Sequence, residues 1–284
     1  MQSSPNGLPQ PPSALVVAHP GHEVRLHGWL ERARPTVFIL TDGSGLAGEP
    51  RIGATARYLS SLGLRPGPVF GRFTDTEVYS ALLGHDFRFF IELSEKLAGE
   101  FARAGVASIV ADAAEGYNTT HDVCRLVADA AASMAGADAG RRLDNYDFPV
   151  VGRPDRCPEH LRGQAVWMEL DDETFGRKLS AAREFYPGLF ADVKDAVHGR
   201  GESPMREFIE RGGEGGGGIE AFRVECLRPA GRGGAVGADG GARPFYETLG
   251  ERQLAAGHVE RVIRYREHIA PLASALGEHA ERRA

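Results

Sequence analysis

Cysteine and long apolar runs are scarce in this chain of 284 residues, and each scarcity excludes a class of protein. The three cysteines, Cys124, Cys157 and Cys226, have no short spacing between them, which argues against a disulfide framework and against a zinc finger. No stretch approaches the roughly 18 consecutive apolar residues that span a membrane. We therefore expect a protein of a reducing compartment, by default the cytoplasm, with no membrane partner.

Three common active-site motifs are also missing. No G-x-G-x-x-G follows the first predicted strand, where a dinucleotide-binding fold carries it, so we do not expect NAD as a cofactor. The absence of G-x-x-x-x-G-K-[ST] excludes a P-loop, and the absence of G-x-S-x-G argues against assignment to the serine α/β-hydrolases. The formal net charge of -6 gives no reason to expect nucleic acid as a partner.

The residues that are present are typical of a folded chain with a polar N-terminal segment. Hydrophobic residues make up 42% and charged residues 25%, which is typical of globular proteins. Residues 1–13 hold four prolines among polar residues and lack basic and apolar regions, so we expect a disordered tail rather than a signal peptide. We expect a Rossmann-like domain over residues 14–228 and a Gly-rich linker with a helical extension over 229–284. The sequence leaves open whether the protein forms a homo-oligomer.

Strand-like and helix-like segments alternate in the first half. Buried runs at 15–18, 36–40 and 106–110 predict parallel strands. The fold class expected from this alternation is α/β, a Rossmann-like three-layer parallel sheet. Helices are predicted at 23–34, 51–62, 78–83, 87–104, 123–134, 174–185 and about 251–276, further strands at 148–151, 165–170 and 219–227, and flexible Gly-rich loops at 211–218 and 231–241.

The first predicted strand ends abruptly in His19-Pro20-Gly21-His22-Glu23. Pro20 and Gly21 stop the strand and turn the chain sharply. His19 and His22 therefore lie at the C-terminal end of the strand, where open α/β sheets bind their ligands. Two imidazoles three residues apart on a tight turn can bind one metal ion. The alternative is a pair of ordinary capping or core histidines.

Polar residues also follow the second and third predicted strands. The carboxyl ends of parallel strands meet at one edge of a sheet, so we expect these side chains to converge on the two histidines. They are Asp42 after the second strand and Asp112, Glu115, Asn118, His121 and Asp122 after the third.

A catalytic zinc ion usually keeps three protein ligands and one open position for water. His19 and His22 supply two ligands, and His121, at the start of a later helix, is the natural third. Zn²⁺ is the expected cofactor, although such ligands also accept iron or nickel. A carboxylate must then accept a proton from the water, and Asp112 is our first candidate and Glu115 our second. Asp42 is a weaker candidate, and turn formation or helix capping is the alternative for Asp42 and Asp112.

Ala18-His19-Pro20-Gly21-His22-Glu23 resembles the A-H-P-D-D-E motif of the PIG-L/LmbE-like deacetylases, which use zinc on N-acetylglucosaminyl and related amides. Residues 115–122 resemble the family's later motif, a glycine-containing loop followed by a ligand histidine, and residues 219–223 are similar to its late E-x-F-R-type stretch. The resemblance covers residues 14–228. It implies a zinc-dependent amidase or deacetylase acting on a small-molecule substrate, sugar-like or otherwise N-acetylated.

Two departures from the family motif concern the chemistry. The family's first aspartate acts as general base, and Gly21, which has no acid or base group, stands in its place. The family's second aspartate is a metal ligand, and His22 replaces it with another ligand. The base must then come from another strand end, or the reaction differs. The alternative is a non-catalytic metal- or ligand-binding protein on the same scaffold.

Three neighbours of the expected ligands also have expected roles. Asn118 stands where the family often has a histidine that stabilises the oxyanion, and its amide N–H is expected to donate there. Glu23 is expected to support His22, and a role as metal ligand is the alternative. Asp122 is a possible ligand in place of His121, although a charge at the start of a helix is the simpler interpretation.

Overall fold

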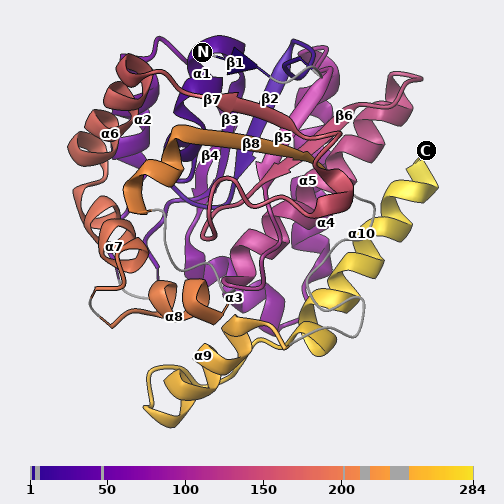
Figure 1. Ribbon diagram of the computed structural model, residues 1–284. Helices are drawn as coiled ribbons and strands as arrows, with labels where there is room; N and C mark the ends of the chain where they lie inside the picture. Colours follow the sequence, from indigo (N-terminus) through magenta and orange to yellow (C-terminus); the bar gives the residue numbers. More distant parts are fainter. Residues whose placement is uncertain are drawn as a thin grey trace.

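One mixed sheet forms the centre of the molecule (Figure 1) in a computed structural model that describes residues 2–3, 7–45, 48–200, 202–211, 218–230 and 243–283. Within these ranges five strands run parallel, and three at one edge each pair antiparallel with the next. The predicted α/β class is confirmed, but the sheet is not wholly parallel. In spatial order the strands are β1 (Gln2–Ser3), β7 (Val166–Glu169), β8 (Val224–Pro229), β6 (Asp144–Phe148), β5 (Ser108–Asp112), β2 (Ser13–Val17), β3 (Thr36–Thr41) and β4 (Pro66–Phe73).

Helices cover both faces of this sheet and give three layers (Figure 1). Alternate residues of β2 serve the two faces, because side chains along a strand point in opposite directions. Ala14 and Val16 pack in the core with α4, α5 and α10, whereas Leu15 and Val17 pack with α1 and α2. The helices are η1 (Glu23–Leu26), α1 (His27–Ala33), α2 (Ile52–Ser61), α3 (Asp75–Leu83), α4 (Phe87–Arg103), α5 (Thr119–Asp138), η2 (Glu159–Leu161), α6 (Asp172–Phe185), α7 (Pro187–Val197), α8 (Pro204–Arg211), η3 (Gly218–Arg223), α9 (Phe245–Ala255), η4 (Tyr265–Ile269) and α10 (Ala270–Arg283).

Two strands of the sheet differ from the sequence prediction. No strand was predicted at the segment of β4, because Pro66, Gly67 and Pro68 are residues typical of a turn. It is instead the edge strand beside β3, where a proline costs no hydrogen bond on the open side. The strand predicted at 148–151 lies earlier, at 144–148, as β6.

The last third of the chain also differs from the prediction. The strand expected at 219–227 begins as the short helix η3, and only Val224 onward joins the sheet as β8. The closing helix expected at 251–276 is two helices, because α9 ends at Ala255 and regular helix resumes only at η4 and α10. Leu272 and Leu276 of α10 belong to the same core as β2. The Gly-rich loops predicted at 211–218 and 231–241 lie mostly outside the described residues.

A buried ion pair fastens β8 to helices on one face of the sheet. Glu225 is 1% exposed and accepts the backbone N–H groups of Gly28 and Trp29, each at 2.9 Å. The Lys178 ammonium of α6 lies 2.9 Å from the same carboxylate, and burial lowers the pKa of Lys178. Removal of one partner from such a pair typically costs about 3–5 kcal/mol. The pair therefore holds α1 and α6 in fixed positions over β8.

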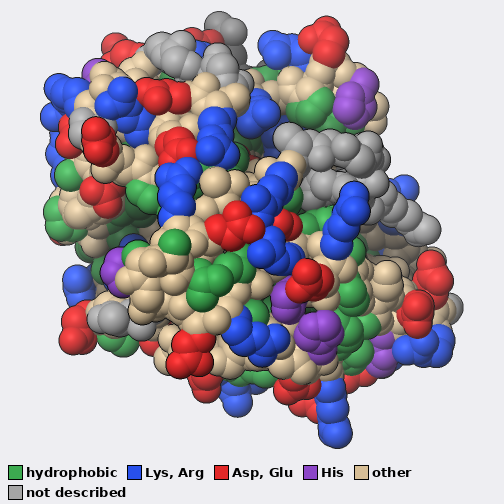
Figure 2. All heavy atoms as spheres, turned by 90° about the horizontal axis from the view of Figure 1, so that it is seen from below, with side chains coloured by type: hydrophobic (Ala, Val, Ile, Leu, Met, Phe, Trp, Pro, Cys, Tyr) green, Lys and Arg blue, Asp and Glu red, His purple; other side chains and the backbone are tan. Residues whose placement is uncertain are grey.

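The state of the cysteines and the mixture of surface charges are those that the composition indicates. All three cysteines are free, as the sequence predicts. In the described ranges, no helix combines the length and the apolar character needed to cross a membrane. On the face that carries α3, α8 and α9, basic and acidic side chains are interspersed (Figure 2).

Candidate metal centre

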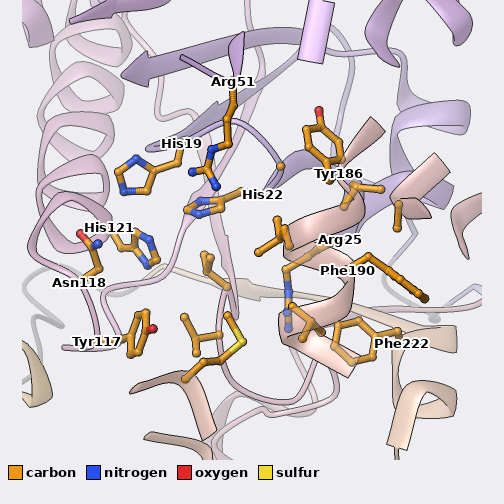
Figure 3. Close-up of a pocket in the computed structure, with 18 of the residues that line it drawn as sticks. His19, His22, Arg25, Arg51, Tyr117, Asn118, His121, Tyr186, Phe190 and Phe222 are labelled. Atoms are coloured by element: carbon orange, nitrogen blue, oxygen red, sulfur yellow. The ribbon is translucent and has the colours of Figure 1, made fainter. Parts of the chain in front are cut away.

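His19, His22 and His121 lie together at the carboxyl end of the parallel strands, as the sequence predicts (Figure 3). The ring centroid of His19 is 5.3 Å from that of His22 and 5.2 Å from that of His121, and the other two are 4.5 Å apart. Three imidazoles around a tetrahedral zinc ion, with Zn–N bonds of about 2.0–2.1 Å, have centroids about 5 Å apart. The spacing of the three rings therefore matches a three-histidine site.

Two local features place these rings. The turn after β2 is closed by Glu23, whose carboxylate accepts the Gly21 N–H at 2.8 Å and is itself hydrogen-bonded by the Tyr186 hydroxyl. Helix α5 begins at Thr119, four residues before its predicted start, and the Asn118 side chain accepts the Thr120 N–H at 2.8 Å as its cap. This early start puts His121 in the first turn of α5.

The environment of His19 leaves one ring nitrogen available. Its Nδ1 lies 2.9 Å from Thr41 Oγ1 and 3.0 Å from Asp75 Oδ1. Burial disfavours the Asp75 carboxylate, but its contact with His19 and the Gly45 N–H outweigh burial and hold its pKa at about 2. An ionised Asp75 keeps the proton on Nδ1. Nε2 of His19 is buried and has no hydrogen-bond partner among the described residues, so it is the ring atom left to bind a metal ion.

Asp112 serves His22 in the same way. Its Oδ2 lies 2.8 Å from His22 Nδ1 and accepts the Ala18 N–H at 2.8 Å. The carboxyl group is fully buried, and this burial raises its pKa to about 7. Such carboxylate–histidine pairs orient metal ligands. We expected Asp112 to act as the base, but the structure places it behind His22 and away from the cavity, where it orients the imidazole.

The other two rings are held in the form that binds a metal ion. Burial, together with the neighbouring histidines, lowers the pKa of His22 and of His121 well below the ordinary value. Both imidazoles are therefore neutral at pH 7 and offer a lone pair. Nδ1 of His121 is buried and has no partner among the described residues.

The three side chains do not yet form a complete metal cage. No group of three or more His, Cys, Asp or Glu side chains in the described ranges is arranged to hold a metal ion as it stands. The rings of His19 and His22 meet edge to face, at 89°. Small adjustments of the side chains would complete the site, and the terminal torsion of histidine is soft. The type of donor and the spacing of the three rings fit zinc.

The remaining predicted residues have structural partners. Glu115 is buried and accepts the N–H groups of residues 150–152, so it holds that loop and does not face the cavity as a base. Asp42 accepts the N–H and hydroxyl of Ser44 in a turn. Asp122 accepts the Gly116 N–H at 3.1 Å. Glu23 supports the Gly21 turn rather than His22.

A cavity of about 290 Å³ opens in front of the three histidines. Asn118, Tyr79 and Tyr117 line it on the side of α3 and α5. Arg51 also lines it, close to His19 and His22 (Figure 3), and its guanidinium has no hydrogen-bond or ion-pair partner among the described residues. The sequence reasoning missed Arg51 and Asp75. Asp75 follows β4, so recognition of that strand would have placed it at the same sheet edge.

Several solved structures are similar to this chain at low sequence identity. No protein-family model and no curated protein matches the chain. Similar solved structures include a deacetylase triple mutant of the teicoplanin biosynthetic pathway, with 15% identity, covering 76% of this chain and 97% of that chain, and a TM-score of 0.47. The A40926 pseudoaglycone deacetylase Dbv21 has 18% identity, 76% and 96% coverage, and a TM-score of 0.45. The conserved protein TT1542 from Thermus thermophilus has 21% identity, 65% and 86% coverage, and a TM-score of 0.43.

Gly21 cannot easily be replaced by the family's aspartate. Its φ of +104° lies in the region that L side chains rarely adopt. A Cβ there would approach Leu189 Cδ2 of α7 to 2.7 Å. Helix α7 therefore fills the space in which the family's first aspartate would begin.

We predict that Gly21→Ala lowers the free energy of unfolding by about 1–3 kcal/mol, because it combines an unfavourable backbone conformation with this close contact. The matched control is Gly99→Ala, at an exposed position of α4 where an added Cβ meets nothing within 4 Å. That change should raise the free energy by about 0.5–1 kcal/mol. Urea denaturation of both variants measures the two effects. A Gly21→Ala protein as stable as the wild type would contradict this account of the turn.

We predict that Asp112→Asn lowers zinc affinity about 10- to 100-fold, because His22 loses the carboxylate that orients it. The measurement is competition for zinc with a chromophoric chelator. His160→Ala, which alters an exposed histidine of η2, is the control and should leave the affinity unchanged. Equal affinities for wild type and Asp112→Asn would show that the pair does not support a metal ligand.

Proposed function

We propose that this protein is a metal-dependent hydrolase of an N-acyl (amide) bond in a small-molecule substrate. The observation that supports this most strongly is the meeting of three imidazoles at one end of a cavity. Two of them, His19 and His22, have carboxylates behind their Nδ1 atoms. The resemblance of residues 18–23 to a zinc deacetylase motif points to the same chemistry.

His19, His22 and His121 are the residues that would hold the metal. Zinc held by these three imidazoles would supply a Lewis acid and would bring the pKa of bound water to about 7. Asn118 lines the cavity, and its carbonyl oxygen is engaged by Thr120, so its NH₂ group is the part that remains to donate to a developing oxyanion. Arg51 is placed to attract an anionic or strongly polar substrate group.

The two departures from the family motif belong together in this proposal. Gly21 supplies no base, and Asp75 is the only carboxylate among the described residues that line the cavity. Asp75 is committed to His19 and to the Gly45 N–H. His22, in place of an aspartate ligand, adds no negative charge to the site. The full cation charge would therefore remain to acidify water, whose proton would pass to bulk solvent, and solvent would in turn protonate the leaving amine in place of a separate carboxylate.

A second candidate is a metal- or ligand-binding protein without catalysis. The observation that favours it is the same lack of an uncommitted carboxylate in the described cavity wall. The two candidates differ in turnover and not in metal content.

We predict that the zinc-loaded protein releases a primary amine from N-acyl substrates, measured with an amine-reactive fluorophore over a panel of N-acyl glucosamines. His121→Ala should lower the rate at least ~100-fold, because a ligand is lost. His160→Ala, the exposed control, should retain the wild-type rate. Stoichiometric zinc with no amine release from any member of the panel would favour the binding protein.

A further inference from the structure

The cavity has a polar end and an apolar end. The histidines, Asn118 and Arg51 lie at one end, and Phe190 and Phe222 lie at the other (Figure 3). We call the apolar end the acyl chamber; its walls come from α6, α7 and η3. Its main residues are Leu179, Ala182, Leu189, Phe190, Val193 and Phe222.

The size of the cavity exceeds what an acetyl group needs. Its volume is about 290 Å³, roughly twice that of a ~150 Å³ protein cavity that binds benzene. At ~30 Å³ each, the volume of one water molecule, about eight to ten non-hydrogen atoms fill the whole cavity, so the amide at the histidines and the acyl group share this space. An acetyl group would leave most of an apolar space without contacts.

The chamber wall contains two cations, and both have partners in the protein. Arg25 lines the chamber, lies with its guanidinium carbon 4.9 Å from the centre of the Phe222 ring, and donates to the Gly152 carbonyl. Lys178, also in the wall, is paired with Glu225. Because both cations are engaged, an uncharged acyl chain fits among the apolar side chains of the chamber.

The amine end has space on the opposite side. Tyr79, Tyr117 and Asn118 line a second cavity of about 610 Å³, between α3 and α9, as well as the first. A substrate bound with its amide at the histidines therefore extends in two directions, the acyl chain toward α7 and the amine toward α9.

We propose that the substrate carries an apolar acyl group of about six or more carbons rather than acetyl. This inference rests on the proposed amide hydrolysis. Leu189 connects the candidate metal centre with the acyl chamber, because it lies against Gly21 at the histidine turn and also lines the chamber. Each methylene buried there should strengthen binding about fourfold, although chain ordering takes back part of this gain.

The test compares N-acetyl-, N-hexanoyl- and N-decanoyl-glucosamine with the zinc-loaded protein. We expect kcat/KM to rise at least ~100-fold from acetyl to decanoyl. A second measurement, independent of turnover, is calorimetric binding of sodium decanoate and sodium acetate, in which only decanoate should bind. Equal kcat/KM for the three chain lengths, or no binding of decanoate, would contradict the proposal that the chamber binds the acyl group.

A substitution in the chamber tests where the acyl chain of the substrate lies. Val193→Phe narrows the chamber, so the ratio of the decanoyl to the acetyl kcat/KM and the affinity for decanoate should each fall at least tenfold. Ala191→Phe, at an exposed position of α7 that does not line the cavity, is the matched control. If Val193→Phe fails to fold, Phe190→Ala tests the same claim and should shift the preference to longer chains. Equal effects of Val193→Phe and Ala191→Phe would contradict the assignment.

The two proposals fail in different ways. Decanoate binding that Val193→Phe weakens, without hydrolysis of any chain length, would support the chamber and contradict the hydrolase. Hydrolysis that depends on the size of the amine and not of the acyl group would support the hydrolase and overturn the acyl chamber.

Discussion

The contact between a buried carboxylate and the Nδ1 atom of a histidine is the interaction on which the site depends. Asp112 at the end of β5 joins the Ala18 N–H and His22, so it ties the ends of two neighbouring strands to one imidazole. Asp75, after β4, contacts His19 in the same way. Both carboxylates are almost completely buried, so neither has water as an alternative partner. Because the strand order β5-β2-β3-β4 sets these positions, the topology of the sheet determines which ring nitrogens face the cavity.

The helices added to this sheet determine what reaches the histidines. Tyr186 and Leu189, at the start of α7, pack against Glu23 and Gly21, so the histidine turn and the acyl chamber share a wall. The buried pair of Lys178 and Glu225 holds α6 in position beside them. A turn without a side chain at position 21 and a chamber walled by α7 are therefore two consequences of the same packing. The glycine at position 21 and the apolar end of the cavity have one structural origin.

The sequence was sufficient to predict the α/β class and the meeting of His19, His22 and His121. Strong β-branched runs marked β2 and β3, and residues after parallel strands converge at one edge. Asp75 was missed because β4 contains two prolines and two glycines, which indicate a turn and hide an edge strand. The sequence placed Asp112 and Glu115 at the right edge of the sheet. It could not show that both carboxylates point into the protein, because that depends on partners brought by Ala18 and the 150–152 loop. The cavity walls of α6 and α7 come from distant segments whose packing has no periodic signal.

The central claim is that three imidazoles bind one metal ion. X-ray absorption at the zinc edge of the zinc-loaded protein tests this most directly, because it reports the type, number and distance of the ligand atoms. The account predicts about three imidazole nitrogens and one further light atom, at about 2.0–2.1 Å. A protein that retains no zinc after loading, or a spectrum dominated by sulfur or by carboxylate oxygen, would contradict it.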